Sequence, residues 1–303
     1  MKRTLWILLL GASFACLGIW VYERLVEGFY KSAIHLQTWP KTEYDTLKCQ
    51  YSVRKARKIV DQPFTYLGKG RQFFVFASSD GNYVLKFIKC QRVDVSAFYK
   101  NMPLPEFLDQ KRQMVLEAKH ERIEGILASI ALAAGPLAQN TGVVFAHLTT
   151  KPQIEKKVLL IDKLGFEHAV ELDGVPFVLQ RKAVGIIPTF SELLSAQKYK
   201  QALKRFGQLV ALIVSDAKAG VVDKDSGTIV RDNVAFLADR AIHVDIGTFE
   251  LRENTLSRAN LEEQLSHLVP LIEWIAIKNP QLAAECEAKI ERAIEQNAKA
   301  VKS

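Results

Sequence analysis

The sequence predicts an α+β protein in two parts, a β-rich half followed by a mainly helical half. Short runs rich in β-branched and aromatic residues, separated by turn residues, are concentrated in residues 61–182. One long helical pattern, Pro105–Ala134, interrupts these runs. Helical patterns then dominate residues 183–303, and a strongly apolar segment precedes both halves.

The composition is that of a globular chain with a basic surface. Its 303 residues are enough for two lobes with a sizeable core, and 49% of them are hydrophobic. The net charge is +8, but no block of Lys and Arg stands out, so we expect no nucleic-acid partner. The surface would also suit nucleotides or lipid headgroups. The four cysteines, Cys16, Cys49, Cys90 and Cys286, form no Cys-x-x-Cys pair, which argues against a disulfide framework or a zinc site.

The N-terminal segment predicts attachment to a membrane. Lys2 and Arg3 precede Thr4–Tyr22, which carries no charge and is long enough to span a bilayer. We therefore expect a single-pass membrane protein, anchored in the lipid bilayer through residues 4–22, with residues 23–60 as a stalk or linker. A cleavable signal peptide and a lipoprotein signal ending before Cys16 are alternatives for residues 1–22. The charge bias slightly favours the N-terminus inside, which would leave the domain outside the cytoplasm, where ATP chemistry would be awkward.

A glycine-containing hairpin opens the β-rich half. Phe73–Ala77 and Tyr83–Ile88 have strand composition, and Ser79–Asn82 between them is a strong turn signal. The preceding strand ends in Leu67–Gly70, where two glycines would let backbone N–H groups approach a phosphate.

Lys86 stands inside the second strand of this hairpin. Val84 and Ile88 share its face of the strand and are both apolar, which predicts that Lys86 points inward. A buried ammonium needs an anionic partner. The alternative is a lysine that faces water on an amphipathic strand.

The remaining elements follow from periodicity and turn residues. In Pro105–Ala134 the apolar positions, from Phe107 and Met114 to Ile130, fall broadly on one side. We expect its glutamates to be solvated unless one of them has a partner. Further strands are expected at Gly142–Leu148, Lys157–Ile161 and Val175–Leu179, the last at a sheet edge because of Pro176, and further helices at Tyr199–Ala219, Asn260–Ile277 and Pro280–Lys299.

The stretch Gly220–Phe249 alternates short apolar runs with acidic loops. Oxygen-bearing side chains lie where the apolar pieces end: Asp223, Asp225, Asn233 and Asp245. Four such side chains at strand ends suit a hard cation such as Mg²⁺ and phosphoryl-transfer chemistry. The alternative is ordinary loop chemistry, because Asp and Asn are also common turn formers.

Taken in order, these motifs resemble the protein-kinase-like superfamily over about residues 60–250. Leu67–Gly70 followed by Val75 is similar to the kinase glycine loop, although Phe73 stands where the third glycine usually is. Val84–Lys86 is similar to the strand that carries the ATP-phosphate lysine.

The resemblance continues in the acidic stretch. Gly220–Asp225 resembles the catalytic loop, with Asp223 where a His commonly sits and Asp225 at the base position. Asn233 would be the metal-binding Asn only with a three-residue insertion, since the usual position is Val230. Ile242–Gly247 resembles the metal-binding Asp-Phe-Gly with Ile for Phe, and looks closer to phosphoinositide-kinase and other atypical branches.

The resemblance implies a two-lobed protein-kinase-like fold that uses ATP and Mg²⁺. Lys86 would hold the α- and β-phosphates, oriented by Glu117 with Glu121 as the second choice, and Asp225 would take the proton of the acceptor hydroxyl. The other implied site residues are Gly68, Gly70 and Val75 over the nucleotide, Ala183 at the adenine, and Asn233 and Asp245 at Mg²⁺.

The implied function is a membrane-anchored, ATP-dependent phosphotransferase that acts on a hydroxyl acceptor. One alternative is a degenerate kinase-like protein that binds a nucleotide or a partner without catalysis. Another is a membrane-tethered binding or structural protein unrelated to kinases. The sequence does not indicate whether the acceptor is a protein, a lipid or a small molecule.

Overall fold

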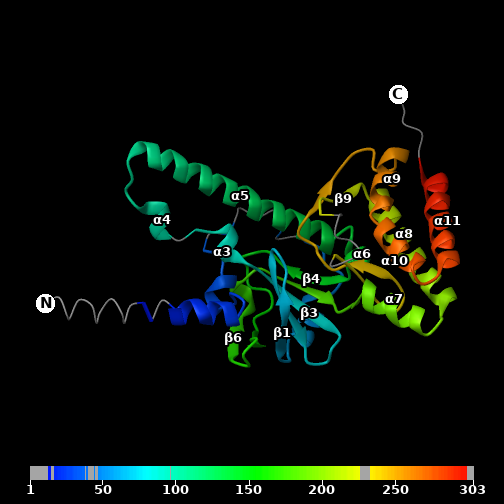
Figure 1. The fold of residues 1–303 in the computed structure, drawn as a ribbon. Coiled ribbons are helices and arrows are strands. Elements are labelled where there is room, and N and C mark those ends of the chain that lie inside the picture. The colour runs from blue at the N-terminus through cyan, green and yellow to red at the C-terminus, as the bar shows by residue number, and fades with distance from the viewer. Residues whose placement is uncertain are drawn as a thin grey trace.

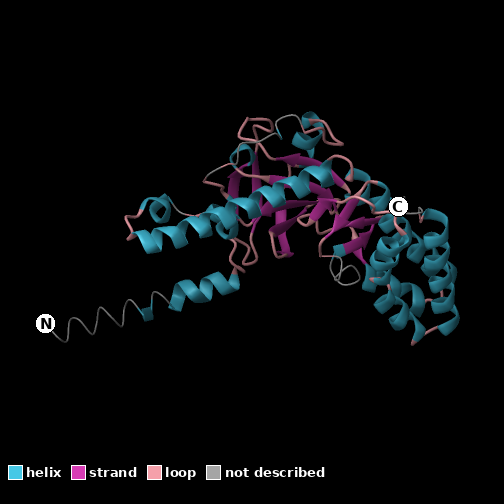
Figure 2. Cartoon of the chain, turned by 90° about the horizontal axis from the view of Figure 1, so that it is seen from above, coloured by secondary structure: helices cyan, strands magenta, loops and turns pink. Residues whose placement is uncertain are grey.

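The computed structural model describes residues 13–14, 17–37, 39, 44, 47–95, 97–225 and 233–298. The fold is α+β, with most strands in the first half of the chain, together with the long helix α5, and mainly helices in the second half (Figure 1). Seen from above, the strands occupy the middle of the molecule and a group of helices lies at one end (Figure 2).

A seven-stranded sheet in the order β4-β7-β3-β2-β1-β5-β6 forms the first half. The hairpin β5–β6 extends the sheet, because β5 pairs parallel with β1 and antiparallel with β6. The strands are β1 (Phe64–Lys69), β2 (Phe73–Ser78), β3 (Tyr83–Ile88), β4 (Val143–His147), β5 (Lys157–Ile161), β6 (Glu167–Glu171) and β7 (Phe177–Arg181).

The predicted hairpin and the strand Lys157–Ile161 are confirmed by this sheet. One strand prediction needs correction. The edge position expected from Pro176 is wrong, because β7 lies between β4 and β3. Pro176 precedes the first residue of β7, so its missing N–H removes no bond from the ladder. Strand β6 was not predicted.

The core of the sheet also includes part of the segment expected to be a stalk. Phe29 is 1% exposed and makes edge-to-face contacts with Phe74 and Phe76 at ring-centroid distances of 5.4 and 4.9 Å. Helix α2 (Val53–Ile59) buries Ala56 in the same core. Residues 23–60 are therefore partly built into the first half, because their apolar side chains cover the sheet.

The long helix α5 (Glu106–Ala134) confirms the predicted helix, but only its second half is buried. Ile123, Leu127 and Ile130 pack against the sheet, whereas Phe107 and Met114 are 64% and 68% exposed. Figure 1 shows the first half projecting away from the sheet. The other helical segments of this half are η1 (Lys31–Ile34), α3 (Cys90–Val93), α4 (Ala97–Asn101), α6 (Ala138–Thr141) and η3 (Leu172–Gly174).

The second half has its own helical core, built from residues between Ile186 and Ile294. Its helices are α7 (Ile186–Ser195), α8 (Tyr199–Lys218), α9 (Arg258–Ser266), α10 (Val269–Ala276) and α11 (Pro280–Asn297). Short strands connect them: β8 (Val184–Gly185), β10 (Val234–Phe236) and β11 (Ala241–His243) form one sheet, and β9 (Val221–Asp223) pairs with β12 (Phe249–Leu251). The predicted helix Tyr199–Ala219 is confirmed by α8.

The predicted membrane segment, residues 4–22, lies mostly outside the described residues. Residues 17–25 are helical. Within the described ranges, none of the helices combines the length and apolar character that a bilayer crossing requires.

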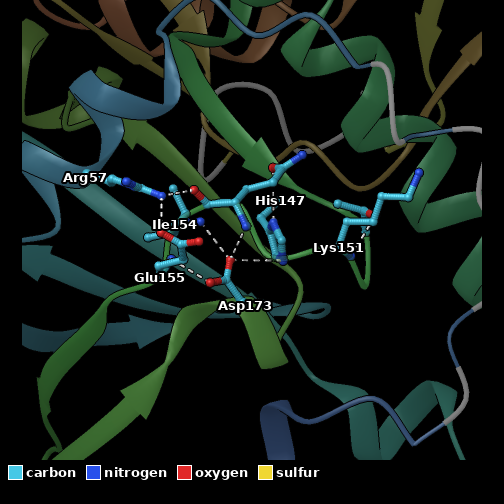
Figure 3. A network of polar contacts seen from close by, with 8 residues as sticks. Arg57, His147, Lys151, Ile154, Glu155 and Asp173 are labelled. Atoms are coloured by element: carbon cyan, nitrogen blue, oxygen red, sulfur yellow. Dashed lines mark hydrogen bonds and ion pairs between the residues drawn. The ribbon is translucent and has the colours of Figure 1, made fainter.

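A polar network fixes the chain between β4 and β5 (Figure 3). The Asp173 carboxylate accepts hydrogen bonds from the backbone N–H groups of Gln153, Ile154 and Glu155 at 2.9, 2.8 and 2.5 Å. Arg57 donates to the Gln153 carbonyl at 2.9 Å and to the Glu155 carboxylate at 2.8 Å. Burial alone would raise the pKa of Asp173, but the three backbone hydrogen bonds outweigh it and hold this pKa below its ordinary value.

Candidate active site

A cleft of about 830 Å³ lies between the β1–β2 turn and the segments around β10 and β11. It brings together chain segments that are far apart in the sequence, from both halves of the molecule. With the exception of Glu117, every residue that the sequence assigned to the site borders this cleft: Gly68, Gly70, Val75, Lys86, Ala183, Asp225, Asn233 and Asp245.

Lys86 is a buried cation in the middle of the sheet. Strand β3 is paired on both sides, by β2 and by β7, and the Lys86 residue is 6% exposed. Its Nζ donates to the backbone carbonyl of Val244, the residue before Asp245. Burial lowers the pKa of Lys86 to about 8, and the negative charge of Asp245 partly offsets this effect. The prediction that Lys86 points inward is confirmed.

The turn that carries Asp245 is held from behind by α5. Ile246 is fully buried among the side chains of that helix. The Ser129 hydroxyl of α5 donates to the Ile246 carbonyl at 2.8 Å and accepts from the Phe249 N–H at 2.7 Å. Ile246 therefore fills a core position, and the turn directs Asp245 to the cleft border.

Gly247 permits a close contact between this turn and the start of β2. The Gln72 Nε2 atom donates to the Gly247 carbonyl at 3.2 Å. A Cβ atom at position 247 would lie 1.3 Å from the Gln72 Oε1 atom. A side chain here would thus displace Gln72, which joins the β1–β2 turn to the Asp245 turn.

Asp225 is held through its backbone by two neighbouring side chains. The Asp223 Oδ1 atom accepts from the Asp225 N–H at 3.0 Å and from the Thr248 hydroxyl at 2.6 Å. The Asn233 Nδ2 atom donates to the Asp225 carbonyl at 2.8 Å. Asn233 therefore reaches Asp225 despite the longer spacing in the sequence, and both residues border the cleft together with Asp245.

The glycines of the β1–β2 turn are not required by the protein's own packing. Neither Gly68 nor Gly70 has a positive φ, and a Cβ on either would meet no atom within 4 Å. The Lys89 ammonium donates to the Gly70 carbonyl at 2.6 Å, which fixes the end of the turn. Phe73, at the expected third glycine, is 4% exposed and belongs to the hydrophobic core.

The structure does not bring Glu117 to Lys86. Glu117 and the second choice, Glu121, are both exposed on α5, and the buried part of this helix starts at Ile123. The long, mostly exposed first half of α5 places both carboxylates before the region that packs behind the site. The carboxylate whose negative charge acts on the Lys86 ammonium is instead that of Asp245.

A buried, hydrogen-bonded pair of side chains, His243 and Asp216, lies next to the site and was not predicted. The His243 Nε2 atom lies 2.7 Å from an oxygen of Asp216 on α8, and the Gln180 amide donates to the His243 carbonyl at 2.8 Å. Burial alone would lower the pKa of His243, but the carboxylates of Asp216, Asp223 and Asp245 together outweigh burial and raise this pKa. The sequence contained both residues, but nothing in their spacing indicated that they pair.

The oxygen donors of the cleft fit a magnesium ion that is also bound by its substrate. Asn233 and Asp245 offer an amide and a carboxylate oxygen, which are ligand types that Mg²⁺ accepts. Throughout the described ranges, no group of three or more His, Cys, Asp or Glu side chains is placed to hold a metal by itself. Mg²⁺ commonly takes one or two protein ligands and completes its shell with phosphates and water.

Comparison with solved structures gives distant structural likenesses. No family model matches the sequence, and no curated protein matches it. A solved structure described as the bifunctional kinase-methyltransferase WbdD has a TM-score of 0.34 and 14% sequence identity to this chain. The match covers 88% of this chain and 48% of that one, so the chain spans about half the length of that structure.

Proposed function

We propose that the chain binds Mg²⁺–ATP in the cleft and transfers the γ-phosphoryl group to a hydroxyl acceptor. The observation that carries this proposal is the convergence of Lys86, Asp225, Asn233 and Asp245 on one cleft, beneath the glycines of the β1–β2 turn. The order of the elements supports it, since a glycine turn, a buried strand lysine, a long helix and an Asp-x-Gly turn follow one another as in a kinase-like fold.

The charges of the cleft suit this chemistry. A triphosphate brings dispersed negative charge, which the buried Lys86 ammonium would neutralise without water between them. Asp245 and Asn233 would hold the magnesium ion that bridges the phosphate oxygens. The carboxylate of Asp225, whose backbone is fixed on two sides, would orient the acceptor hydroxyl and receive its proton.

Gly68 and Gly70 add a separate line of support. Gly70 lies in the turn and Gly68 at the irregularity near the end of β1, and a Cβ on either would meet no protein atom within 4 Å, so both leave room for a close ligand. Ala183 and Val75 add small apolar surface at the border of the cleft, which suits the face of a purine.

The membrane anchor belongs to the same proposal. Residues 4–22 would hold the chain at a bilayer, because an uncharged segment of this length is stable there. A reporter fused after Ser303 would show on which side of the membrane the cleft lies. Fractionation of the full chain with membranes is the expected result, and recovery of the whole chain in the unbound fraction would contradict the anchor.

A second candidate function is nucleotide binding without transfer. The observation that favours it is the absence of an α5 glutamate beside Lys86, since Glu117 and Glu121 are exposed. A kinase-like protein that lacks this partner can keep a nucleotide site and lose the geometry of transfer.

Two measurements on the purified full chain separate these candidates. Thermal denaturation with and without Mg²⁺–ATP tests binding, and we expect a higher Tm only when both the metal and the nucleotide are present. Release of ADP with labelled phosphate in an acceptor tests transfer, which we expect to be lost in Asp225→Ala. Binding without any turnover would select the second candidate, and absence of both would reject the nucleotide site.

A further inference from the structure

A second, strongly cationic pocket of about 510 Å³ adjoins the cleft. Its basic lining consists of Arg71, Lys89, Arg92, Arg122 and Lys224, from β1–β2, α3, α5 and the end of β9. The two cavities share Arg71 and Asp225, so the pocket meets the cleft at the proposed base.

The protein neutralises only part of this positive charge. Lys224 is paired with Glu250 at 2.5 Å. Within the described ranges, the side chains of Lys89 and Arg92 donate to backbone carbonyls, those of Gly70 and Arg71. Arg71 and Arg122 have no ion-pair partner among the residues that the structure describes. Beside the Asp225 carboxylate at its border, the pocket thus gathers guanidinium and ammonium donors that suit an anion from outside.

The cations of this pocket lie close enough to repel one another. Burial, together with the positive charges of Arg92 and Lys69, lowers the pKa of Lys89 to about 8. An anion bound between Lys89, Arg92 and Arg122 would relieve this repulsion. Phosphate suits the site well, because Arg side chains bind its oxygens in pairs.

We propose that this pocket binds a phosphate group carried by the acceptor, so that the substrate is a hydroxylated molecule already bearing a phosphate. This inference rests on the function proposed above. The acceptor oxygen would form a new bond to the γ-phosphorus while the bond from that phosphorus to the β–γ bridging oxygen breaks. The hydroxyl proton would pass to Asp225 and ADP would leave.

The pocket also lies beside the first described helix. A shallower depression of about 250 Å³ is lined by Trp20 and Arg24 of residues 17–25 and shares Lys89 and Arg92 with the pocket. A phosphate at this place could belong to a lipid headgroup or to a free small molecule. The chemistry of recognition is the same for both, and the source is decided by experiment.

The test uses inorganic phosphate as the probe and Arg122→Gln as the variant. Arg122 is exposed on α5 and glutamine is a good helix former, so the variant keeps the helix. Lys111→Gln, on the exposed first half of the same helix, is the matched control. Phosphate is titrated by calorimetry into the full chain with and without saturating Mg²⁺–ADP.

We expect phosphate binding that persists with Mg²⁺–ADP and weakens about 10-fold in Arg122→Gln but not in Lys111→Gln. The proposal that this pocket binds phosphate would be wrong if Mg²⁺–ADP abolished phosphate binding, or if the two variants bound phosphate equally well. If Mg²⁺–ADP itself does not bind while phosphate binding still depends on Arg122, the anion site stands and the proposed function fails.

The acceptor role and its source are tested by ADP release from Mg²⁺–ATP. Glycerol 3-phosphate is compared with glycerol, and phosphatidylcholine vesicles containing phosphatidic acid are compared with pure phosphatidylcholine. Stimulation by a phosphate-bearing probe, lost in Arg122→Gln, supports the proposal and identifies the source as soluble or lipid. Equal turnover with all four additions would reject the acceptor role of the pocket.

Discussion

Two polar clusters of the molecule use their carboxylates in opposite ways. Asp173 accepts three backbone hydrogen bonds and lies 4.0 Å from His147, so its oxygens serve the fold (Figure 3). Among the described residues, Asp245 accepts a single side-chain hydrogen bond, a 3.3 Å contact from the Gly247 N–H within its own turn, and it borders the open cleft together with the buried Lys86. A carboxylate that is hydrogen-bonded within the protein stabilises the fold. A carboxylate that borders a cleft is available to bind a ligand.

The largest effects are expected from two single variants, Asp245→Asn and Lys86→Met. Loss of either charge should reduce phosphoryl transfer by about 10³-fold, because each acts on charge that develops in the transition state. Labelled-phosphate transfer measures the effect. Urea unfolding is the control, and a large loss of stability together with activity would mean that Asp245 is structural like Asp173.

The reverse result is expected for Asp173→Ala. Three backbone N–H groups would lose their acceptor, which should lower the free energy of unfolding by roughly 2–4 kcal/mol. Nucleotide affinity, measured below the unfolding transition, should stay within a factor of two or so of wild type. A variant that unfolds at the same urea concentration as the wild type would show that water replaces the carboxylate at no cost.

The pH dependence of stability should follow the same carboxylate. The pKa of folded Asp173 lies below its ordinary value of 3.8, so its stabilisation is fully present above that value and is lost as the pH falls through the folded pKa. The difference in stability between wild type and Asp173→Asn should therefore shrink on acidification. Urea midpoints between pH 3 and pH 7 measure this, and a difference that grows toward low pH would contradict the assignment.

A smaller effect is expected from Gly247→Ala. The new methyl group must displace Gln72 and break its hydrogen bond to the Gly247 carbonyl. Loss of one neutral hydrogen bond is worth about 1 kcal/mol, which would weaken Mg²⁺–ATP binding about 5-fold. The companion variant Gln72→Ala should show the same loss, and the double variant should add little to either.

The smallest effect is expected from Glu117→Gln. This side chain is exposed on α5 and has no place at the cleft, so activity and stability should both match the wild type. Turnover below a tenth of wild type would restore Glu117 as the partner of Lys86, and would require α5 to move in the working protein.

Periodicity and turn residues predicted most of the fold, because β2, β3, β5, α5 and α8 have strong local patterns. The same local information misplaced Pro176, since a proline next to a strand start looks the same in sequence whether the strand is central or at an edge. It also treated residues 23–60 as a linker. The burial of Phe29 depends on two aromatic residues of β2, which no local pattern reveals.

The candidate site was predictable where chemistry and spacing coincide. Lys86 was flagged by its apolar strand, and Asp245 by its Asp-x-Gly turn. The prediction that Glu117 orients Lys86 was wrong. Helical periodicity indicates on which face of a helix a residue lies, but not which part of the helix packs against the rest of the protein. The sequence also gave no indication of the roles of Asp216, Ser129 and Gln72. Each of these side chains bonds to a partner at least 27 residues away in the chain, which no local pattern reveals.

The hydroxyl of Ser129 connects α5 directly to the Asp245 turn through two hydrogen bonds. It sits near the buried end of a helix of 29 residues, which is roughly 44 Å long at 1.5 Å per residue. The first half of that helix is exposed, and Ser129 lies in the buried part that packs against the rest of the protein. A partner that moved the exposed end of α5 at Phe107 would therefore act on the position of the Asp245 turn through the Ser129 hydrogen bonds.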